Sequence, residues 1–212
     1  MKYTHLLFDL DGTITYSHLG IYNSVNYAMQ QMGRGELGQE MLRKFVGPPL
    51  RISFQEIAGF CEQDALRAVA FYRERYSKIG WREVELIPGA KELLFDLQKA
   101  GYHLALATSK PAVFADKIVE ELGILSCFEQ TGVATFQNDT KPFVIAELIF
   151  RLGVDKNQCL MIGDRSHDVL GAREVGVDCA GLYVGYAEQN ELETAGATYV
   201  FKDFSSLREF LL

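Results

Sequence analysis

Short apolar runs alternate with amphipathic helical patterns along most of this chain, and this alternation limits its fold more than any other feature. Four runs contain little polar alternation, as strands buried on both faces do. They span residues 5–8, 102–107, 159–162 and 181–184. Between them, apolar side chains recur three and four residues apart, which predicts helices over residues 113–122 and 144–152. The sequence therefore predicts an α/β fold around a mostly parallel sheet.

Two weaker runs, at residues 130–133 and 198–201, bring the expected sheet to five or six strands. Glycine and threonine weaken the first of these two predictions. The expected core is therefore Rossmann-like, a parallel sheet flanked by helices.

Residues 15–84 break the alternation, because they contain two helical stripes and no convincing strand. The stripes consist of Ile21, Val25, Ala28, Met29 and Met32, and of Ala65, Leu66, Val69, Tyr72 and Tyr76. The strand and helix pattern resumes near a Pro-Gly turn at residues 88–89. We expect an all-helical domain of residues 15–84, inserted after the first strand into a core of residues 1–14 and 85–212.

Composition excludes several classes of protein. The chain has 212 residues, 48% of them hydrophobic, which suffices for a substantial core. Its net charge of -7 disfavours binding to nucleic acid polymers through a basic face. The four cysteines lie far apart without metal-type spacing, which favours reduced thiols over structural zinc.

Neither a secretory signal nor a membrane span is expected. Asp9 and Asp11 lie where a signal peptide would need apolar residues, and no apolar run approaches the ~20 residues of a spanning helix. We therefore expect a cytoplasmic protein without a membrane partner, either a monomer or a homodimer.

The first predicted strand ends in Asp9, Asp11 and Gly12, at the edge where open parallel sheets bind ligands. Two residues apart in extended chain, the two carboxylates point to one side, and Gly12 permits a sharp turn. Such crowded carboxylates normally require a cation. The alternative is a turn with two solvated aspartates, since Asp-Gly pairs are common in turns.

A second acidic pair, Asp164 and Asp168, follows the strand at residues 159–162, where a helix begins. Together the two acidic strand ends predict a site for a hard cation, and their oxygen ligands suit Mg²⁺ better than zinc. Considered alone, Asp164 and Asp168 could simply be helix N-caps.

Thr108, Ser109 and Lys141 could bind a phosphate at the same edge. Thr108 and Ser109 follow the strand at residues 102–107 and offer a hydroxyl and loop amides near a helix start. Lys141, just before another predicted helix, could supply a point positive charge. Alternatively, the two hydroxyl residues cap a helix and Lys141 is solvated.

In this combination and order, these motifs resemble those of the haloacid dehalogenase (HAD) superfamily of phosphohydrolases. Residues 9–13 match its first motif, Thr108 its second, Lys141 its third and residues 163–168 its fourth. The helical insertion resembles its C1-type cap, so the resemblance spans the whole chain.

Within the superfamily, the chain is similar to phosphoglycolate-phosphatase-like proteins and close to some 5′-nucleotidase-like members. Residues 47–50 (Gly-Pro-Pro-Leu) and residues 163–168 carry this similarity. The chain departs from the pattern at Tyr16, where relatives commonly have Asp, and at Ala187, where they often have Gly. We expect neither departure to touch the catalytic carboxylates, although both could alter cap closure or specificity.

The resemblance implies a mechanism and a set of site residues. Asp9 would attack phosphorus to form an aspartyl-phosphate, while Asp11 would protonate the leaving oxygen and then deprotonate the hydrolytic water. Mg²⁺ would be bound by Asp9, Asp11, Asp164 and Asp168. Phosphate would be bound by backbone amides at Leu10 and Gly12, with Thr108, Ser109 and Lys141.

The cap would act as a lid over a small phosphorylated metabolite and exclude polymers. Ser17, Pro49 and Arg51 are the candidates for substrate contact, with Arg51 suited to a second anionic group. Arg51 could equally be solvated surface. His167 is expected to orient its turn or face solvent, not to act in catalysis.

The predicted function is therefore a Mg²⁺-dependent phosphatase for small phosphate monoesters. Three alternatives remain: a 5′-nucleotidase, a phosphomutase that uses the same aspartyl-phosphate, and a non-enzymatic binding or regulatory protein on this scaffold. The presence of all the acidic residues and of Lys141 argues against the last.

Overall fold

The computed structural model describes residues 2–212, which divide into two compact units. One unit comprises residues 2–16 and 86–212, and the other comprises residues 17–85. We call the first the core unit and the second the cap unit, and each is described by itself.

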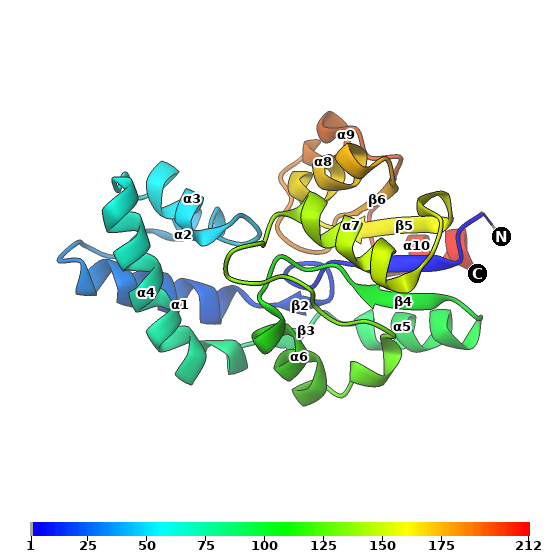
Figure 1. The fold of residues 1–212 in the computed structure, drawn as a ribbon, viewed down its shortest axis with the longest axis horizontal. Helices are drawn as coiled ribbons and strands as arrows, with labels where there is room; N and C mark the ends of the chain where they lie inside the picture. Colours follow the sequence, from blue (N-terminus) through cyan, green and yellow to red (C-terminus); the bar gives the residue numbers. More distant parts are fainter. Residues whose placement is uncertain (1) are drawn as a thin grey trace. The chain divides into compact units, whose positions relative to one another are not determined.

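The core unit is built on a parallel sheet that has five strands within the described residues, in the order β4-β1-β5-β6-β7 (Figure 1). The strands are β1 (His5–Phe8), β4 (His103–Leu106), β5 (Cys159–Gly163), β6 (Asp178–Leu182) and β7 (Tyr199–Phe201). This confirms the predicted α/β fold with its mostly parallel sheet.

Helices cover both faces of this sheet. Figure 1 shows α7 (Lys141–Leu152) and α8 (Ser166–Val175) on one face and α5 (Ala90–Lys99) on the other. Leu7, Ala105 and Met161 form a buried cluster with apolar residues of α7 and α8. Because side chains alternate along a strand, their neighbours face the opposite layer. The remaining helices are α6 (Ala112–Glu121), α9 (Glu191–Ala195) and α10 (Phe204–Leu211), with short 3₁₀ turns η2 (Leu125–Cys127) and η3 (Lys156–Gln158).

Two sequence predictions about strands need correction. No strand forms at residues 130–133, where only an isolated bridge joins Gln130 to Ala105. Gly132 there packs against α6, since an added Cβ would lie 3.1 Å from that of Ala115. The strand predicted at residues 181–184 is β6, which spans Asp178–Leu182. Because Asp178 is polar, a search for apolar runs does not find the start of this strand.

The cap unit is helical, as predicted, with α1 (His18–Gln31), α2 (Gln39–Arg43), α3 (Leu50–Glu56), α4 (Glu62–Lys78) and η1 (Gly80–Arg82). Both predicted stripes are buried for most of their length. Leu66 is an exception, since it is 53% exposed, and Val113 in the core unit is also exposed at 51%. Both lie at the border of their apolar stripes, where the 3.6-residue period turns a side chain toward solvent.

The chain passes from the core unit to the cap unit and back through two short strands, β2 (Thr15–Tyr16) and β3 (Glu85–Leu86), which pair with each other. The sequence did not predict these strands because they have only two residues each. None of the described helices is long and apolar enough to span a membrane.

Candidate active site

The register of the sheet brings three strand ends together. Phe8, the last residue of β1, pairs with Leu106 of β4 on one side and with Ile162 of β5 on the other. Residues just beyond these three therefore lie at one edge, the carboxyl edge of the sheet. Asp9, Thr108 and Asp164 are among them, as the sequence predicts.

Lys141 joins two of the predicted carboxylates. Its Nζ lies 2.7 Å from Oδ1 of Asp9 and 2.8 Å from Oδ1 of Asp168, and it donates to the carbonyl of Ala107 at 2.9 Å. Lys141 is the first residue of α7, so the helix start aims its side chain at the carboxyl edge. Asp9, Lys141 and Asp168 are all more than 90% buried, so these ion pairs are shielded from water.

Asp164 completes a group of three carboxylates. One oxygen from each of Asp9, Asp164 and Asp168 lies within 4.8 Å of the others. Buried oxygen ligands at this spacing suit a hard divalent cation such as Mg²⁺. Asp11, predicted as a further metal ligand, is not part of this group.

The charges in this group do not balance. Burial raises the pKa of Asp9 to about 7 despite the opposing effect of Lys141, and Asp168 and Asp11 add smaller increases. Burial also raises the pKa of Asp164 well above its ordinary value. Burial would lower the pKa of Lys141, but Asp168 and Asp9 raise it above its ordinary value. One ammonium faces three carboxylates, so the donor set fits a bound cation.

Asp164 is oriented by the turn after β1 and by the loop after β6. Its Oδ1 accepts a hydrogen bond from Oγ1 of Thr13 at 3.2 Å, and its Oδ2 accepts one from the backbone N–H of Tyr186 at 2.7 Å. The segment at residues 184–187 therefore touches Asp164, a predicted metal ligand, next to the departure at Ala187. The donor is the backbone amide of Tyr186. The departure from the family pattern at Ala187 concerns side-chain identity, so it gives no information about this contact.

Glycines allow these segments to pack closely. At Gly163, an added Cβ would lie 2.3 Å from Cγ of Asp168, and at Gly185 it would lie 2.0 Å from the carbonyl of Gly12. Gly12 itself has φ +95, and its Cβ would lie 2.4 Å from Oδ2 of Asp164. No side chain fits at these three positions without moving a carboxylate or the backbone of the turn.

Asp11 pairs with a second lysine that the sequence analysis did not single out. Nζ of Lys110 lies 3.0 Å from Oδ2 of Asp11, and both side chains are largely buried. The other oxygen, Oδ1, is buried and has no hydrogen-bond partner among the described residues. Lys110 follows Ser109 in the predicted phosphate motif. Its position at the end of a strand could therefore have indicated that it is a site residue.

The predicted phosphate-binding residues differ in burial and in the hydrogen bonds that they make. Thr108 is buried, and its Oγ1 accepts a hydrogen bond from the Lys110 N–H at 3.1 Å, which leaves the hydroxyl proton for a ligand. Ser109 is half-buried. The Gly12 N–H donates to the Thr15 carbonyl at 2.8 Å, so in this geometry it closes the turn. The Leu10 carbonyl accepts from Thr15 in the same turn.

The three candidates for substrate contact, Ser17, Pro49 and Arg51, belong to the cap unit. Ser17 is buried, and its Oγ has no hydrogen-bond partner among residues 2–212. Pro49 precedes α3 as its N-cap. Arg51 is exposed and pairs with Glu62 of α4 at 3.2 Å, which fits the solvated-surface alternative. His167 is exposed, as expected.

A model of one protein family matches residues 6–182, which include the strand-end motifs, and that family is described as haloacid dehalogenase-like hydrolase. The chain belongs to the haloacid dehalogenase-like hydrolases. This HAD membership confirms the resemblance derived from the sequence motifs.

Relatives and solved structures extend this finding. A 5′-nucleotidase of Pseudomonas aeruginosa is 38% identical, with 100% of this chain and 96% of that protein covered. The tyrosine-protein kinase PtkA of Mycobacterium tuberculosis is 34% identical over 92% of this chain and 67% of its own length. A crystal structure of a predicted phosphatase from Clostridium acetobutylicum is 35% identical with a TM-score of 0.95, covering 100% of this chain and 99% of that one.

At lower identity, a phosphoglycolate phosphatase of Colwellia psychrerythraea matches at 29%, with 95% of this chain and 94% of that protein covered. The family and its phosphatase-named members identify the chain as a HAD-family phosphatase. The comparisons name several different substrates, so the substrate of this chain does not follow from them.

Replacing Lys110 with Met tests the second ion pair. Without the ammonium, Oδ2 of Asp11 loses its buried partner, and the carboxylate no longer has a fixed position. We expect kcat to fall by roughly tenfold to hundredfold, part of the 10²–10⁴-fold that general acid–base catalysis contributes, with little change in KM. Steady-state kinetics on an aryl phosphate measure this, with Lys99→Met on the exposed side of α5 as the matched control. An unchanged kcat in Lys110→Met would contradict a positioning role.

Glu191, at the start of α9, holds the loop between Asp164 and Asp168 in place. Its Oε1 accepts hydrogen bonds from the Ser166 N–H at 2.8 Å and from Nε of Arg165 at 2.9 Å. Burial would raise the pKa of Glu191, but these bonds and one from the Glu188 N–H lower it from 4.5 to about 2.

The low pKa of Glu191 predicts a pH-dependent contribution to stability. This contribution is complete above pH 4.5 and is lost as the pH falls toward about 2. Glu191→Gln should therefore lower the free energy of unfolding near neutral pH by about 1–2 kcal/mol, with a smaller loss at pH ~3. Denaturant unfolding at several pH values checks this, with the exposed Glu174→Gln as control. A loss that stays constant down to pH ~3 would contradict the assignment.

Proposed function

We propose that this phosphatase is Mg²⁺-dependent and hydrolyses small-molecule phosphate monoesters through an aspartyl-phosphate formed on Asp9. The observation that carries the proposal is the buried group at the carboxyl edge of the sheet, where Lys141 lies between Asp9 and Asp168 and Asp164 lies close to both.

In the first step, a carboxylate oxygen of Asp9 attacks phosphorus while the bond between phosphorus and the leaving oxygen breaks. Lys141 contacts one oxygen of Asp9 at 2.7 Å, which fixes the carboxylate and adds a positive charge beside the transferring group. The Thr108 hydroxyl and the Ser109 amide would contact the phosphate oxygens.

Asp11 supplies and removes protons. It would protonate the leaving oxygen as the alcohol departs and then take a proton from the water that attacks the aspartyl-phosphate. Lys110 holds one oxygen of Asp11, while the other is buried without a partner among the described residues. An exchanging proton would reside on that second oxygen.

Mg²⁺ would be held by Asp9, Asp164 and Asp168. When bound, it offsets the negative charge of the phosphate dianion and of these carboxylates. This neutralisation is needed because three carboxylates and a dianion greatly outweigh the single charge of Lys141. Thr13 and the Tyr186 amide fix the orientation of Asp164, which would help this carboxylate to hold the ion.

The cap unit would act as a lid that limits water during the first transfer and admits only small substrates. Ser17, Pro49 and Arg51 stay candidates for contact with the part of the substrate beyond the phosphate. A lid of this kind argues against polymeric substrates such as nucleic acids.

A nucleoside monophosphate is a second, narrower candidate for the substrate. The relative that is named 5′-nucleotidase is 38% identical, whereas the phosphoglycolate phosphatase from Colwellia is 29% identical. A phosphomutase would need a bound bisphosphate to reorient, and no cap motif indicates this. A non-enzymatic role fits poorly with an intact acidic group paired with Lys141.

Replacing Asp9 with Asn tests the nucleophile. The amide keeps the shape of the side chain but does not attack phosphorus, so Mg²⁺-dependent phosphate release from an aryl phosphate should fall by roughly three orders of magnitude or more. Circular dichroism should show an intact fold, and the exposed Asp116→Asn serves as the matched control. Substantial activity in Asp9→Asn would refute the proposal.

A substrate panel separates the two candidates. It should contain nucleoside 5′-monophosphates, phosphoglycolate and sugar phosphates, assayed with Mg²⁺ by phosphate release. We expect a nucleoside 5′-monophosphate to have the highest kcat/KM, because of the 38% relative. A higher value for phosphoglycolate would overturn the nucleotidase candidate while leaving the phosphatase mechanism in place.

A further inference from the structure

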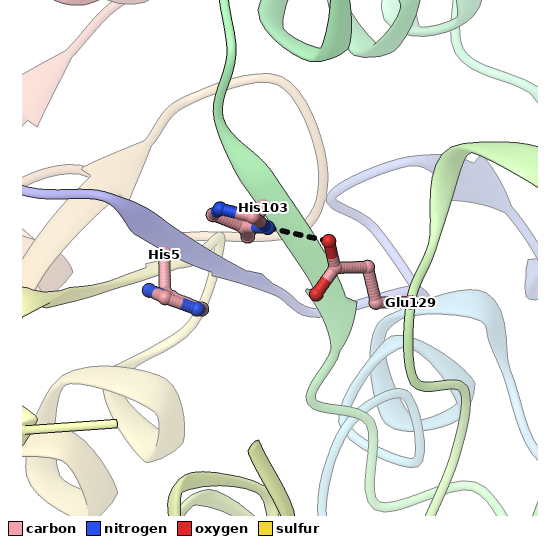
Figure 2. A group of neighbouring side chains, drawn as sticks. All are labelled: His5, His103 and Glu129. Carbon is pink, nitrogen blue, oxygen red and sulfur yellow. Dashed lines mark hydrogen bonds and ion pairs between the residues drawn. The ribbon is translucent and has the colours of Figure 1, made fainter. Parts of the chain in front are cut away.

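Two histidines and a glutamate lie together at the edge of the sheet opposite the acidic group. His5 is the first residue of β1, His103 is the first of β4, and the parallel register places them directly side by side. Their rings are stacked, with centroids 4.7 Å apart and an interplanar angle of 16°. Figure 2 shows Glu129 beside His103, with its carboxylate toward a nitrogen of that ring, and His5 on the other side of His103.

Backbone hydrogen bonds fix the positions of all three residues. The His103 N–H donates to the carbonyl of Thr4 at 3.0 Å, next to His5. The Glu129 N–H donates to the carbonyl of Leu104 at 2.9 Å, so the segment that carries Glu129 is attached to β4. The three side chains therefore extend from a rigid part of the core unit, as a preorganised site requires.

The donor atoms are those that borderline metals prefer. One ligand atom from each of His5, His103 and Glu129 lies within 4.8 Å of the others. Two imidazole nitrogens with one carboxylate oxygen suit Zn²⁺, Cu²⁺ or Co²⁺, whereas Mg²⁺ favours oxygen ligands alone. Bond lengths near 2.0–2.2 Å place two ligands of one tetrahedral zinc about 3.3 Å apart. The ligand atoms, which lie within 4.8 Å of one another, would have to move closer and the two rings to turn toward the ion when it binds.

The surroundings also suit a metal. The side chains of His103 and Glu129 are 49% and 51% exposed, so an ion can enter from solvent with waters for its remaining positions. Nδ1 of His5 lies 2.9 Å from Oγ1 of Thr4, the kind of second contact that orients a ligating imidazole. Burial and the nearby His103 lower the pKa of His5. Imidazole binds metal ions in its neutral form.

We propose that His5, His103 and Glu129 form a second divalent-metal site, for a borderline ion such as Zn²⁺ or Cu²⁺, at the amino edge of the sheet. The ion would link β1, β4 and the segment at Glu129. Its effect would be structural, because Asp9 follows β1 at the strand's other end, so the ion would raise thermal stability without taking part in phosphate hydrolysis.

Cu²⁺ paramagnetic resonance on the untagged, full-length protein tests this proposal. The Asp9, Asp164 and Asp168 group offers oxygen ligands only, so coupling to imidazole nitrogen distinguishes the two sites. With one equivalent of Cu²⁺ in excess Mg²⁺, the nitrogen signal should be present in the wild type and lost in His5→Gln/His103→Gln. The matched control is His18→Gln/His167→Gln, which replaces the other two of the four histidines and should keep the signal.

A second measurement covers the case in which the double variant does not fold. Glu129→Gln keeps both imidazoles, and we expect its Zn²⁺ affinity to fall by about tenfold or more. Zn²⁺ should raise the melting temperature of the wild type more than that of Glu129→Gln. A nitrogen signal that survives in His5→Gln/His103→Gln, oxygen-only Cu²⁺ binding in the wild type, or unchanged Zn²⁺ affinity in Glu129→Gln would each overturn the proposal.

Discussion

The arrangement of the carboxyl edge depends on one interaction, the buried contact of Lys141 with Asp9 and Asp168 at 2.7 and 2.8 Å. Buried carboxylates repel one another and lose hydration, which would separate or protonate them. The ammonium at the start of α7 opposes both effects, but its single charge cannot neutralise three acids. This excess of negative charge destabilises the folded state. It would also favour binding of a cation, and the bound cation would favour binding of a phosphate.

Close backbone packing makes this concentration of charge possible. Gly12, Gly163 and Gly185 have no Cβ where the turn after β1, the end of β5 and the loop after β6 meet. The Tyr186 amide can therefore reach Asp164, and Asp168 can lie against the backbone of β5. Hydrogen-bond donors from backbone and from Thr13 replace the lost water. The orientation of Asp164 thus comes in part from the main chain, which side-chain comparisons do not report.

Much of the fold and the acidic group could be predicted from sequence because both follow from position along strands. Asp9 and Asp164 come directly after buried apolar runs, and parallel strands bring such positions to one edge. The pairing of Lys110 with Asp11 was not predictable in this way, since the direction of a side chain in a loop depends on the tertiary path of that loop. The strand expected at residues 130–133 failed for a related reason, because packing of Gly132 against α6 overrides a weak local preference.

The register of β1 determines what both edges of the sheet can bind. Phe8 pairs with Leu106 and Ile162 at one end, and His5 pairs with His103 at the other. A slip of one residue would shift Asp9 by about 3.3 Å relative to β5 and would separate the two imidazoles. It would also turn Leu7 away from the cluster beneath α7 and α8 and toward the opposite buried layer, which would disrupt the packing of both layers. Packing of the β1 side chains into the buried layers on both faces of the sheet therefore specifies the register. The register in turn places the acidic group and the histidine pair at opposite ends of the same strand.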